Sequence, residues 1–519
     1  MPAKIFSATT LGLDAVLIEV EVDVSKGMHS FDVVGLADSA IKESRQRVGS
    51  AINNLKLESP LRITKKVIVN LVPANIKKSG SGFDLPISIA FLVASQQLTI
   101  TREKLDSILF VGEVTLDGFL KPISGVISIT EMAENKGFKE IVVPKDNEIE
   151  ALMIKKNIKV VALNKLSEVI DYLLDKINYQ ETKIDINDYL LTKTPINEVD
   201  FGDIRGQYAA KRAIMISASG GHNLIMVGSP GSGKTLLAKA LANILPPLTL
   251  TESLEITKIY SIAGYLNINN PLVNRRPFRS PHHSASSASI VGGGATPKPG
   301  EISLAHRGIL FLDELPEFNR LVVESLRQPL EEGSVTITRV EDSLTFPAKF
   351  ILISAMNPCP CGWLNDDHHE CNCTANNILK YQKKISGPIL DRIDLQINVN
   401  SVDFEKAFQP SNRNENKQIQ EKIIMARQKQ AIRFKNNPRH ILLNGEMNVK
   451  DIEIYCPIND ELKAILKTAM DKYALTMRSL HKIIKISRTI ADLENSNDIL
   501  PAHIMEALQY KTGFNEIIN

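Results

Sequence analysis

Apolar and polar positions in the first third of the chain alternate between the two-residue period of strands and the longer period of helices. Strand-like segments and one helical segment follow one another here, which predicts mixed α/β structure. The predicted strands are residues 15–24, 66–71, 141–143 and 160–163, and the predicted helix is residues 38–55. We therefore expect a first domain over residues 1–177.

A second α/β pattern follows a polar stretch. Residues 178–200 are mostly polar and end where new apolar segments begin, which predicts a linker. Segments 224–227, 308–312 and 350–354 are too continuously apolar for half-exposed strands, so we expect buried parallel strands. This pattern predicts a second domain over residues 201–405.

The remaining chain, over residues 406–519, has a helical pattern after a polar break at 409–417. The length of 519 residues suits about three domains, and 43% hydrophobic residues are ordinary for a globular protein. Lys plus Arg total 61 against 59 for Asp plus Glu, a balance that neither favours nor excludes nucleic acid. The longest apolar stretch, residues 85–94, is too short to span a bilayer. With no signal peptide in evidence, we predict a cytoplasmic protein without a membrane partner.

A glycine-rich loop follows the strand at 224–227 and precedes a helical segment. Its pattern is G-x-x-x-x-G-K-T, in the strand-to-helix context that phosphate-binding loops require. Glycines let backbone N–H groups approach phosphates, Lys234 reaches the β- and γ-phosphates, and the Thr235 hydroxyl binds Mg²⁺. We therefore predict ATP and Mg²⁺ as cofactors. The predicted binding residues are Gly228, Ser229, Pro230, Gly231, Ser232, Gly233, Lys234 and Thr235.

Two later strands end in polar residues that fit ATP hydrolysis. Asp313 and Glu314 directly follow the apolar run at 308–312. Asp313 would hold Mg²⁺ through water, and Glu314 would polarise the attacking water. Asn357, after the third strand, would orient water at the γ-phosphate; the alternative is a turn asparagine before Pro358.

Four of the five cysteines lie close together. Cys359, Cys361, Cys371 and Cys373 form two C-x-C pairs. In a reducing compartment such a cluster indicates a metal rather than disulfides, and four thiolates suit tetrahedral Zn²⁺. We predict a structural zinc site in an insertion over residues 359–373; the alternative is four reduced surface thiols.

The three ATPase motifs, in this order, resemble those of AAA+ ATPases, and longer stretches resemble the magnesium-chelatase-like ComM/YifB family. These stretches are residues 34–48, 70–87, 276–294, 299–318 and 356–395. The resemblance implies an AAA+ P-loop core with a parallel sheet, an N-terminal Lon-protease-like α/β domain and a C-terminal helical lid. It also implies an ATP-driven hexameric DNA helicase that promotes branch migration when transforming DNA is integrated. Single-stranded or branched DNA and a recombinase are the implied partners.

The resemblance assigns roles to two arginines. Arg392, in the segment SGPILDRIDL, matches an arginine that acts on the ATP of a neighbouring subunit, and Arg478 matches the sensor arginine of the lid. Because such a finger cannot reach its own site, the resemblance implies a ring of identical subunits, a homohexamer. The alternative for Arg392 is a salt bridge to Asp391 or Asp394.

The Lon-like first domain raises protease activity as a rival function. The positions that align with the Lon serine and lysine hold Gly82 and Ile129, so we predict an inactive scaffold. A chelatase-type or protein-remodelling ATPase is the other alternative. For DNA contacts, Arg339 in a hairpin at 334–346 is the candidate to bind phosphate; the alternative is a solvated charge on the hairpin. We expect the loop at 275–294 to contact DNA or a neighbouring subunit.

Overall fold

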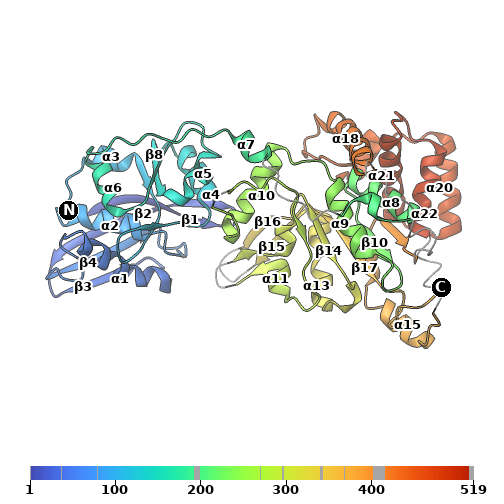
Figure 1. The fold of residues 1–519 in the computed structure, drawn as a ribbon, viewed down its shortest axis with the longest axis horizontal. Helices are drawn as coiled ribbons and strands as arrows, with labels where there is room; N and C mark the ends of the chain where they lie inside the picture. Colours follow the sequence, from blue (N-terminus) through green and yellow to red (C-terminus); the bar gives the residue numbers. More distant parts are fainter. Residues whose placement is uncertain are drawn as a thin grey trace. The chain divides into compact units, whose positions relative to one another are not determined.

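A computed structural model describes most of the chain (Figure 1). The described residues are 2–36, 38–78, 80–191, 199–268, 270–294, 297–338, 343–366, 369–400 and 415–512. The chain forms two compact units. The first comprises residues 1–192, 249–274 and 294–298, and the second comprises residues 193–248, 275–293 and 299–519.

The first unit is built on a seven-stranded mixed sheet with the strand order β3-β4-β2-β1-β5-β8-β9. Its strands are β1 (Ala3–Leu11), β2 (Asp14–Lys26), β3 (Ser30–Val34), β4 (Lys65–Val72), β5 (Ile108–Phe110), β8 (Glu140–Pro144) and β9 (Lys159–Leu163). The antiparallel pairs are β1–β2 and β2–β4, and the other neighbours are parallel. Alternation along β2 buries Ile18, Val20 and Val22 on one face, as the period of two requires.

The first unit also contains helices. They are α1 (Ser39–Asn54), α2 (Asp84–Ala94), α3 (Arg102–Asp106), α4 (Val126–Asn135), α5 (Glu148–Leu152), α6 (Leu166–Leu173) and α7 (Ile186–Leu191). The strands and the helix predicted from the sequence for this region are confirmed. Helix α7 lies inside the stretch predicted as a linker, whose polar composition did not indicate a helix.

Helix α10 (Leu250–Ala263) packs in the first unit, although it follows the glycine-rich loop in the sequence. The Ser261 hydroxyl donates to the Glu150 carboxylate at 2.5 Å and accepts from the Gly125 N–H at 2.8 Å. Both bonds are buried. Helix α10 falls in the range 201–405 that was predicted as the second domain. It nevertheless packs on the N-terminal sheet domain, through hydrogen bonds as well as apolar contacts.

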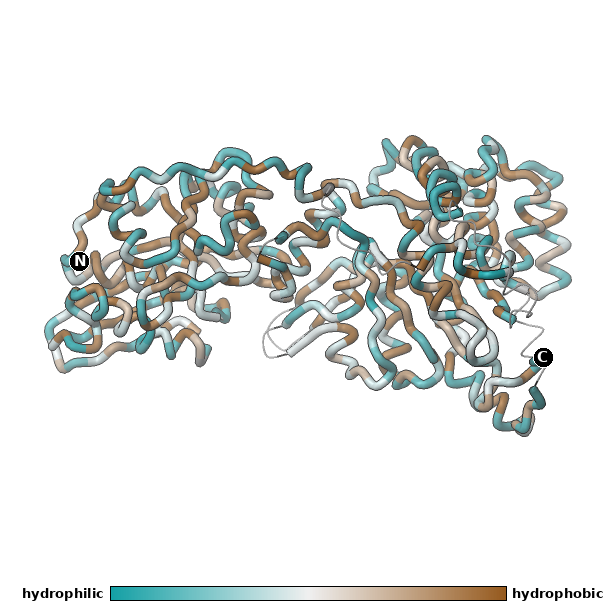
Figure 2. The backbone as a smooth tube through the Cα atoms, viewed as in Figure 1, coloured by the Kyte–Doolittle hydropathy of each residue, from teal (hydrophilic) through white to brown (hydrophobic). Residues whose placement is uncertain are grey.

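The second unit contains a five-stranded sheet with the order β11-β14-β17-β10-β18, and all its neighbouring strands are parallel. Its strands are β10 (Leu224–Val227), β11 (Phe278–Arg279), β14 (Ile309–Leu312), β17 (Ile351–Met356) and β18 (Leu395–Asn398). Every residue of β10, β14 and β17 is buried, which explains why all of them except Ser354 are apolar (Figure 2).

Helices complete the second unit and include a helical C-terminal region. They are α8 (Tyr208–Gly220), α9 (Lys234–Ile244), α11 (Ser287–Val291), α12 (Glu301–Leu304), α13 (Arg320–Ser325), α14 (Arg327–Glu332), α15 (Ala375–Gln382), α16 (Gly387–Leu390), α18 (Glu415–Phe434), α19 (Val449–Tyr455), α20 (Asp460–Tyr473), α21 (Met477–Leu493) and α22 (Pro501–Thr512). Ile483 and Ile504 of this region share one apolar core with Leu224 of the sheet. The predicted α/β class, with a parallel sheet and a helical C-terminal region, is confirmed.

The predicted hairpin is also present. Strands β15 (Ser334–Thr338) and β16 (Ser343–Pro347) pair antiparallel. Arg339, the candidate phosphate contact, lies outside the described residues. Within the described part of the chain, none of the helices combines the length and apolar character needed to cross a membrane.

Replacing Ser261 tests how α10 is fastened to the first unit. Ser261→Ala removes the partner of a buried N–H and of a buried carboxylate, so we expect the free energy of unfolding to fall by about 1–3 kcal/mol. Chemical denaturation measures the change. Thr251→Ala, at an exposed position of the same helix, is the control and should cost less than about 0.5 kcal/mol. Equal losses in the two variants would contradict this role for Ser261.

Candidate active site

Parallel pairing brings the three predicted ATPase motifs to one edge of the sheet. Met356, the last residue of β17, pairs with Val227 at the end of β10, and Leu312 at the end of β14 pairs with Ser354. The glycine-rich loop, Asp313 and Asn357 follow these three strand ends. Because carboxyl ends of neighbouring parallel strands meet at the same edge, the polar side chains after them converge.

Lys234, the first residue of α9, connects the loop to Asn357. Its ammonium donates to the carbonyls of Gly228 at 2.7 Å and Ser229 at 2.8 Å, and to Asn357 Oδ1 at 3.3 Å. Burial lowers the pKa of Lys234, and the nearby carboxylates Asp313 and Glu314 oppose that shift. The loop's own backbone therefore holds the cation in place, and phosphate oxygens would compete with those carbonyls for it.

Two glycines of the loop are required by geometry. A Cβ at Gly228 would lie 2.1 Å from the carbonyl oxygen of Val399, which is far inside contact distance. Gly233 has a φ of +91°, in the left-handed region, directly before α9 begins. This turn places the N-terminus of α9 at the end of the glycine-rich loop. The N–H groups and the helix dipole at that N-terminus favour binding of an anion.

Thr235 and Asp313 lie in direct contact. The Thr235 hydroxyl donates to Asp313 Oδ2 at 2.8 Å. Oxygen ligands of this kind, one hydroxyl and one carboxylate on neighbouring elements, suit Mg²⁺. The two residues predicted to hold the ion are therefore close enough to share one.

Glu314 lies on a turn with a positive φ, near a histidine that the sequence did not link to it. Its backbone has a φ of +52°, and its N–H donates to Asp313 Oδ1 at 3.0 Å. His283 Nδ1 lies 3.5 Å from Glu314 Oε2.

The loop at 275–294 was predicted to contact DNA or a neighbouring subunit. Two of its basic residues form contacts within the second unit itself. Arg279 pairs with Glu301 at 2.6 Å, and Arg276 donates to the Pro246 carbonyl at 2.8 Å.

The cysteine insertion packs directly on the glycine-rich loop. A Cβ at Gly362 would lie 2.6 Å from Pro230 Cδ, and Gly362 has a φ of +88°. A glycine is therefore needed both for the backbone conformation and for the close approach. Any group that fixes the shape of the insertion also constrains Pro230.

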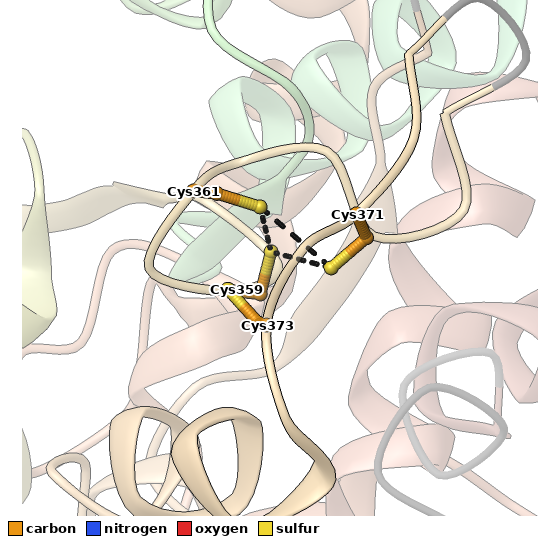
Figure 3. Close-up of side chains that lie close together, drawn as sticks. All are labelled: Cys359, Cys361, Cys371 and Cys373. Carbon is orange, nitrogen blue, oxygen red and sulfur yellow. Dashed lines mark hydrogen bonds between the residues drawn. The ribbon is translucent and has the colours of Figure 1, made fainter.

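The four clustered cysteines converge as their spacing predicted (Figure 3). The sulfur of Cys359 lies 3.4 Å from that of Cys361 and 3.7 Å from that of Cys371, and Cys361 and Cys371 are 3.6 Å apart. With Cys373, all four sulfurs lie within 4.8 Å of one another. A tetrahedron with Zn–S bonds of about 2.3 Å has an edge of about 3.8 Å, so the cluster has the dimensions of a four-thiolate metal site.

The insertion also favours thiolate at one of these positions. A hydrogen bond from the backbone N–H of Trp363 is the main cause that lowers the pKa of Cys361 to about 6. Burial raises the pKa of Cys359, which has less access to solvent. Since the thiolate is the form that binds metals, Cys361 is the best prepared ligand of the four.

Arg392 and Arg478 meet at a carboxylate that the sequence did not indicate. Arg392 Nη2 lies 2.8 Å from Glu331 Oε1, and Arg478 Nη2 contacts the same oxygen. Asp394, suggested as an alternative partner for Arg392, pairs instead with Lys482 at 2.8 Å. Burial opposes ionisation of Asp394, but Lys482 and His222 outweigh it and hold its pKa far below the usual range.

Three family models match successive parts of the chain. They are described as subunit ChlI of Mg-chelatase at residues 20–147, magnesium chelatase, subunit ChlI, at 200–407, and the C-terminal part of that subunit at 413–511.

Similar proteins extend the match to nearly the full length. Competence protein ComM of Haemophilus influenzae is 40% identical over 516 residues, which cover 98% of this chain and 97% of that protein. Protein YifB of Escherichia coli is 38% identical, with 98% and 96% covered. The DNA replication licensing factor mcm6 of Dictyostelium discoideum is 23% identical over 310 residues, covering 56% of this chain and 31% of that protein.

Gly362→Ala tests whether the insertion positions the glycine-rich loop. The added Cβ would displace Pro230, so we expect the KM for ATP to rise about tenfold, equivalent to about 1.4 kcal/mol. Steady-state ATPase assays measure it. Gly137→Ala is the matched control, because Gly137 has a φ of +84° and no atom within 4 Å of an added Cβ. An unchanged KM in Gly362→Ala would contradict the positioning role.

Proposed function

The chain belongs to the magnesium-chelatase-like ComM/YifB family of AAA+ ATPases, and on this premise we propose that it is an ATP-driven DNA helicase. It would act by promoting branch migration during the integration of transforming DNA by homologous recombination. The ATPase activity is supported by two hydrogen bonds at one edge of the sheet: Lys234 donates to Asn357, and Thr235 donates to Asp313. The names of the ComM and mcm6 relatives, a competence protein and a DNA replication factor, support the DNA part.

The side chains around the loop divide the chemistry of ATP hydrolysis among them. Lys234 binds the β- and γ-phosphates, and Thr235 and Asp313 hold Mg²⁺, which neutralises phosphate charge when bound. Glu314 accepts a proton from the attacking water, and Asn357 orients that water at the γ-phosphate. Such positioning and charge stabilisation account for most of the catalysis in phosphoryl transfer.

A homohexameric ring completes each site in this proposal. Arg392 supplies positive charge to the γ-phosphate of the neighbouring subunit, and Arg478 senses nucleotide from the helical region. The β15–β16 hairpin faces the ring's channel and carries Arg339, which contacts DNA phosphates. A recombinase is the expected partner on single-stranded or branched DNA.

The cysteine cluster serves as a structural zinc site. Four thiolates satisfy tetrahedral Zn²⁺ completely, which leaves no open position for catalysis. The ion would fix the loop that carries Gly362 and, through its contact with Pro230, the glycine-rich loop. Its contribution is therefore to the shape of the nucleotide site.

A chelatase-type ATPase that remodels a protein or inserts Mg²⁺ into a porphyrin is the second candidate. The descriptions of the matched family models favour it. The two candidates differ in their response to DNA: only the helicase should hydrolyse ATP faster with forked or branched DNA and displace a labelled strand. Absence of both effects would favour the chelatase-type function.

Lys234→Ala tests the coupling of hydrolysis to DNA movement. Removing the phosphate-binding cation should lower ATPase at least about 100-fold and abolish branch migration on a three-strand or Holliday-type substrate. Lys239→Ala is the control, because Lys239 is exposed on the same helix and should retain both activities. Migration that survives in Lys234→Ala without ATPase would contradict the mechanism.

Elemental analysis tests the metal site. We expect about one zinc per chain in the purified protein, and its loss in Cys361→Ser, because a hydroxyl is a poor zinc ligand. Cys456→Ser should keep the metal, since Cys456 is buried in the core of the second unit and outside the cluster. Metal-free wild-type protein, purified without chelators, would contradict the zinc site.

A further inference from the structure

Glu331 is the next-to-last residue of α14. Its side chain contacts two arginines from distant parts of the chain. Oxygen Oε1 of Glu331 lies 2.8 Å from Arg392 Nη2 and also contacts Arg478 Nη2. Arg392 follows α16, and Arg478 lies in the first turn of α21. Three separate elements of the second unit therefore meet at one carboxylate oxygen.

The two arginines are held differently. Arg392 is 11% exposed, and its Nη1 donates to the Pro388 carbonyl at 2.6 Å, so its guanidinium is fixed from two sides. Arg478 and Glu331 are each 43% exposed. Because the Glu331 side chain and one of its two cations are partly exposed to solvent, another anion can reach this place.

The charges at this place are unequal. Burial opposes ionisation of Glu331, but hydrogen bonds from Arg392 and Arg478 outweigh it and lower its pKa. The carboxylate is therefore ionised at neutral pH, yet it supplies one negative charge to two guanidinium groups. A phosphate group offers more charge and more acceptor oxygens, and paired guanidinium groups bind phosphate oxygens well.

We propose that Glu331 is a positioning residue of the ATPase, which holds Arg392 and Arg478 together and yields both to phosphate oxygens of the nucleotide bound by the neighbouring subunit. The carboxylate takes the place of a phosphate oxygen before nucleotide binds. This inference rests on the proposed ATPase roles of the two arginines. It adds that nucleotide must compete with an anion of the protein itself.

Competition of this kind predicts that removing the anion strengthens nucleotide binding. Glu331→Gln keeps the shape of the side chain and removes its charge, so the arginines lose their ionic partner. In assays without DNA, we expect the KM for ATP to fall about threefold or more, with kcat within about twofold of wild type. A residue that only supported the fold would raise KM or lower kcat when replaced.

Glu332→Gln is the matched control. Glu332 is the exposed neighbour on the same helix, and its carboxylate accepts from Gln328 at 2.9 Å. This variant should keep the wild-type KM. Glu331→Asp, which retains the charge, should keep a KM closer to wild type than Glu331→Gln does.

A double-mutant cycle shows whether the effect passes through the arginines. Binding of a fluorescent non-hydrolysable ATP analogue is the readout, since it survives loss of hydrolysis. The gain from Glu331→Gln should vanish when Arg392 and Arg478 are both alanine. An equal gain in that background would overturn the proposal, as would an unchanged or raised KM in Glu331→Gln alone.

These outcomes are separate from those that test the helicase. The measurements use no DNA, so failure of DNA to stimulate ATPase leaves them intact. If Glu331→Gln leaves KM unchanged in an enzyme that Lys234→Ala inactivates, Glu331 has no such role and the ATPase assignment stands.

Discussion

Parallel pairing of β14, β17 and β10 is the constraint on which the nucleotide site depends. The three strands are buried on both faces, and their register places their carboxyl ends together. Residues from three distant parts of the sequence can then touch. The short Thr235 hydroxyl reaches Asp313, and Lys234 reaches Asn357. A shift of β10 along its neighbours would separate both pairs.

The loop itself is held from several sides, and each support has a different chemistry. Its own carbonyls bind the Lys234 ammonium, the carbonyl of Val399 closes against Gly228, and the cysteine insertion packs on Pro230. These contacts reduce the number of loop conformations before nucleotide arrives, which lowers the entropy lost on binding. A metal in the insertion would therefore influence ATP affinity without touching ATP.

Local patterns predicted much of this architecture. Continuous apolar runs identified the buried strands, and the glycine spacing located the turn into α9, because both depend on neighbouring residues alone. The cysteine spacing likewise predicted the convergence of sulfurs now seen at Cys359, Cys361 and Cys371.

Such local patterns could not predict contacts between elements that are distant in the sequence. Glu331 has an ordinary helical setting, and nothing in its neighbourhood shows that Arg392 and Arg478 converge on it. The approach of His283 to Glu314 likewise requires the loop after β11 to turn toward β14, which no local pattern shows. Ser261 fastens α10 to residues more than a hundred positions earlier, where no sequence period operates.

Mixing two inactive variants tests most directly whether a neighbouring subunit completes each nucleotide site. Lys234→Ala subunits lack a working loop but keep Arg392, and Arg392→Ala subunits keep the loop. If the arginine acts in trans, random assembly of equal amounts gives about a quarter of the interfaces one intact loop and one intact arginine. We therefore predict that the mixture regains about a quarter of wild-type ATPase. A mixture as inactive as its two components would contradict a shared site.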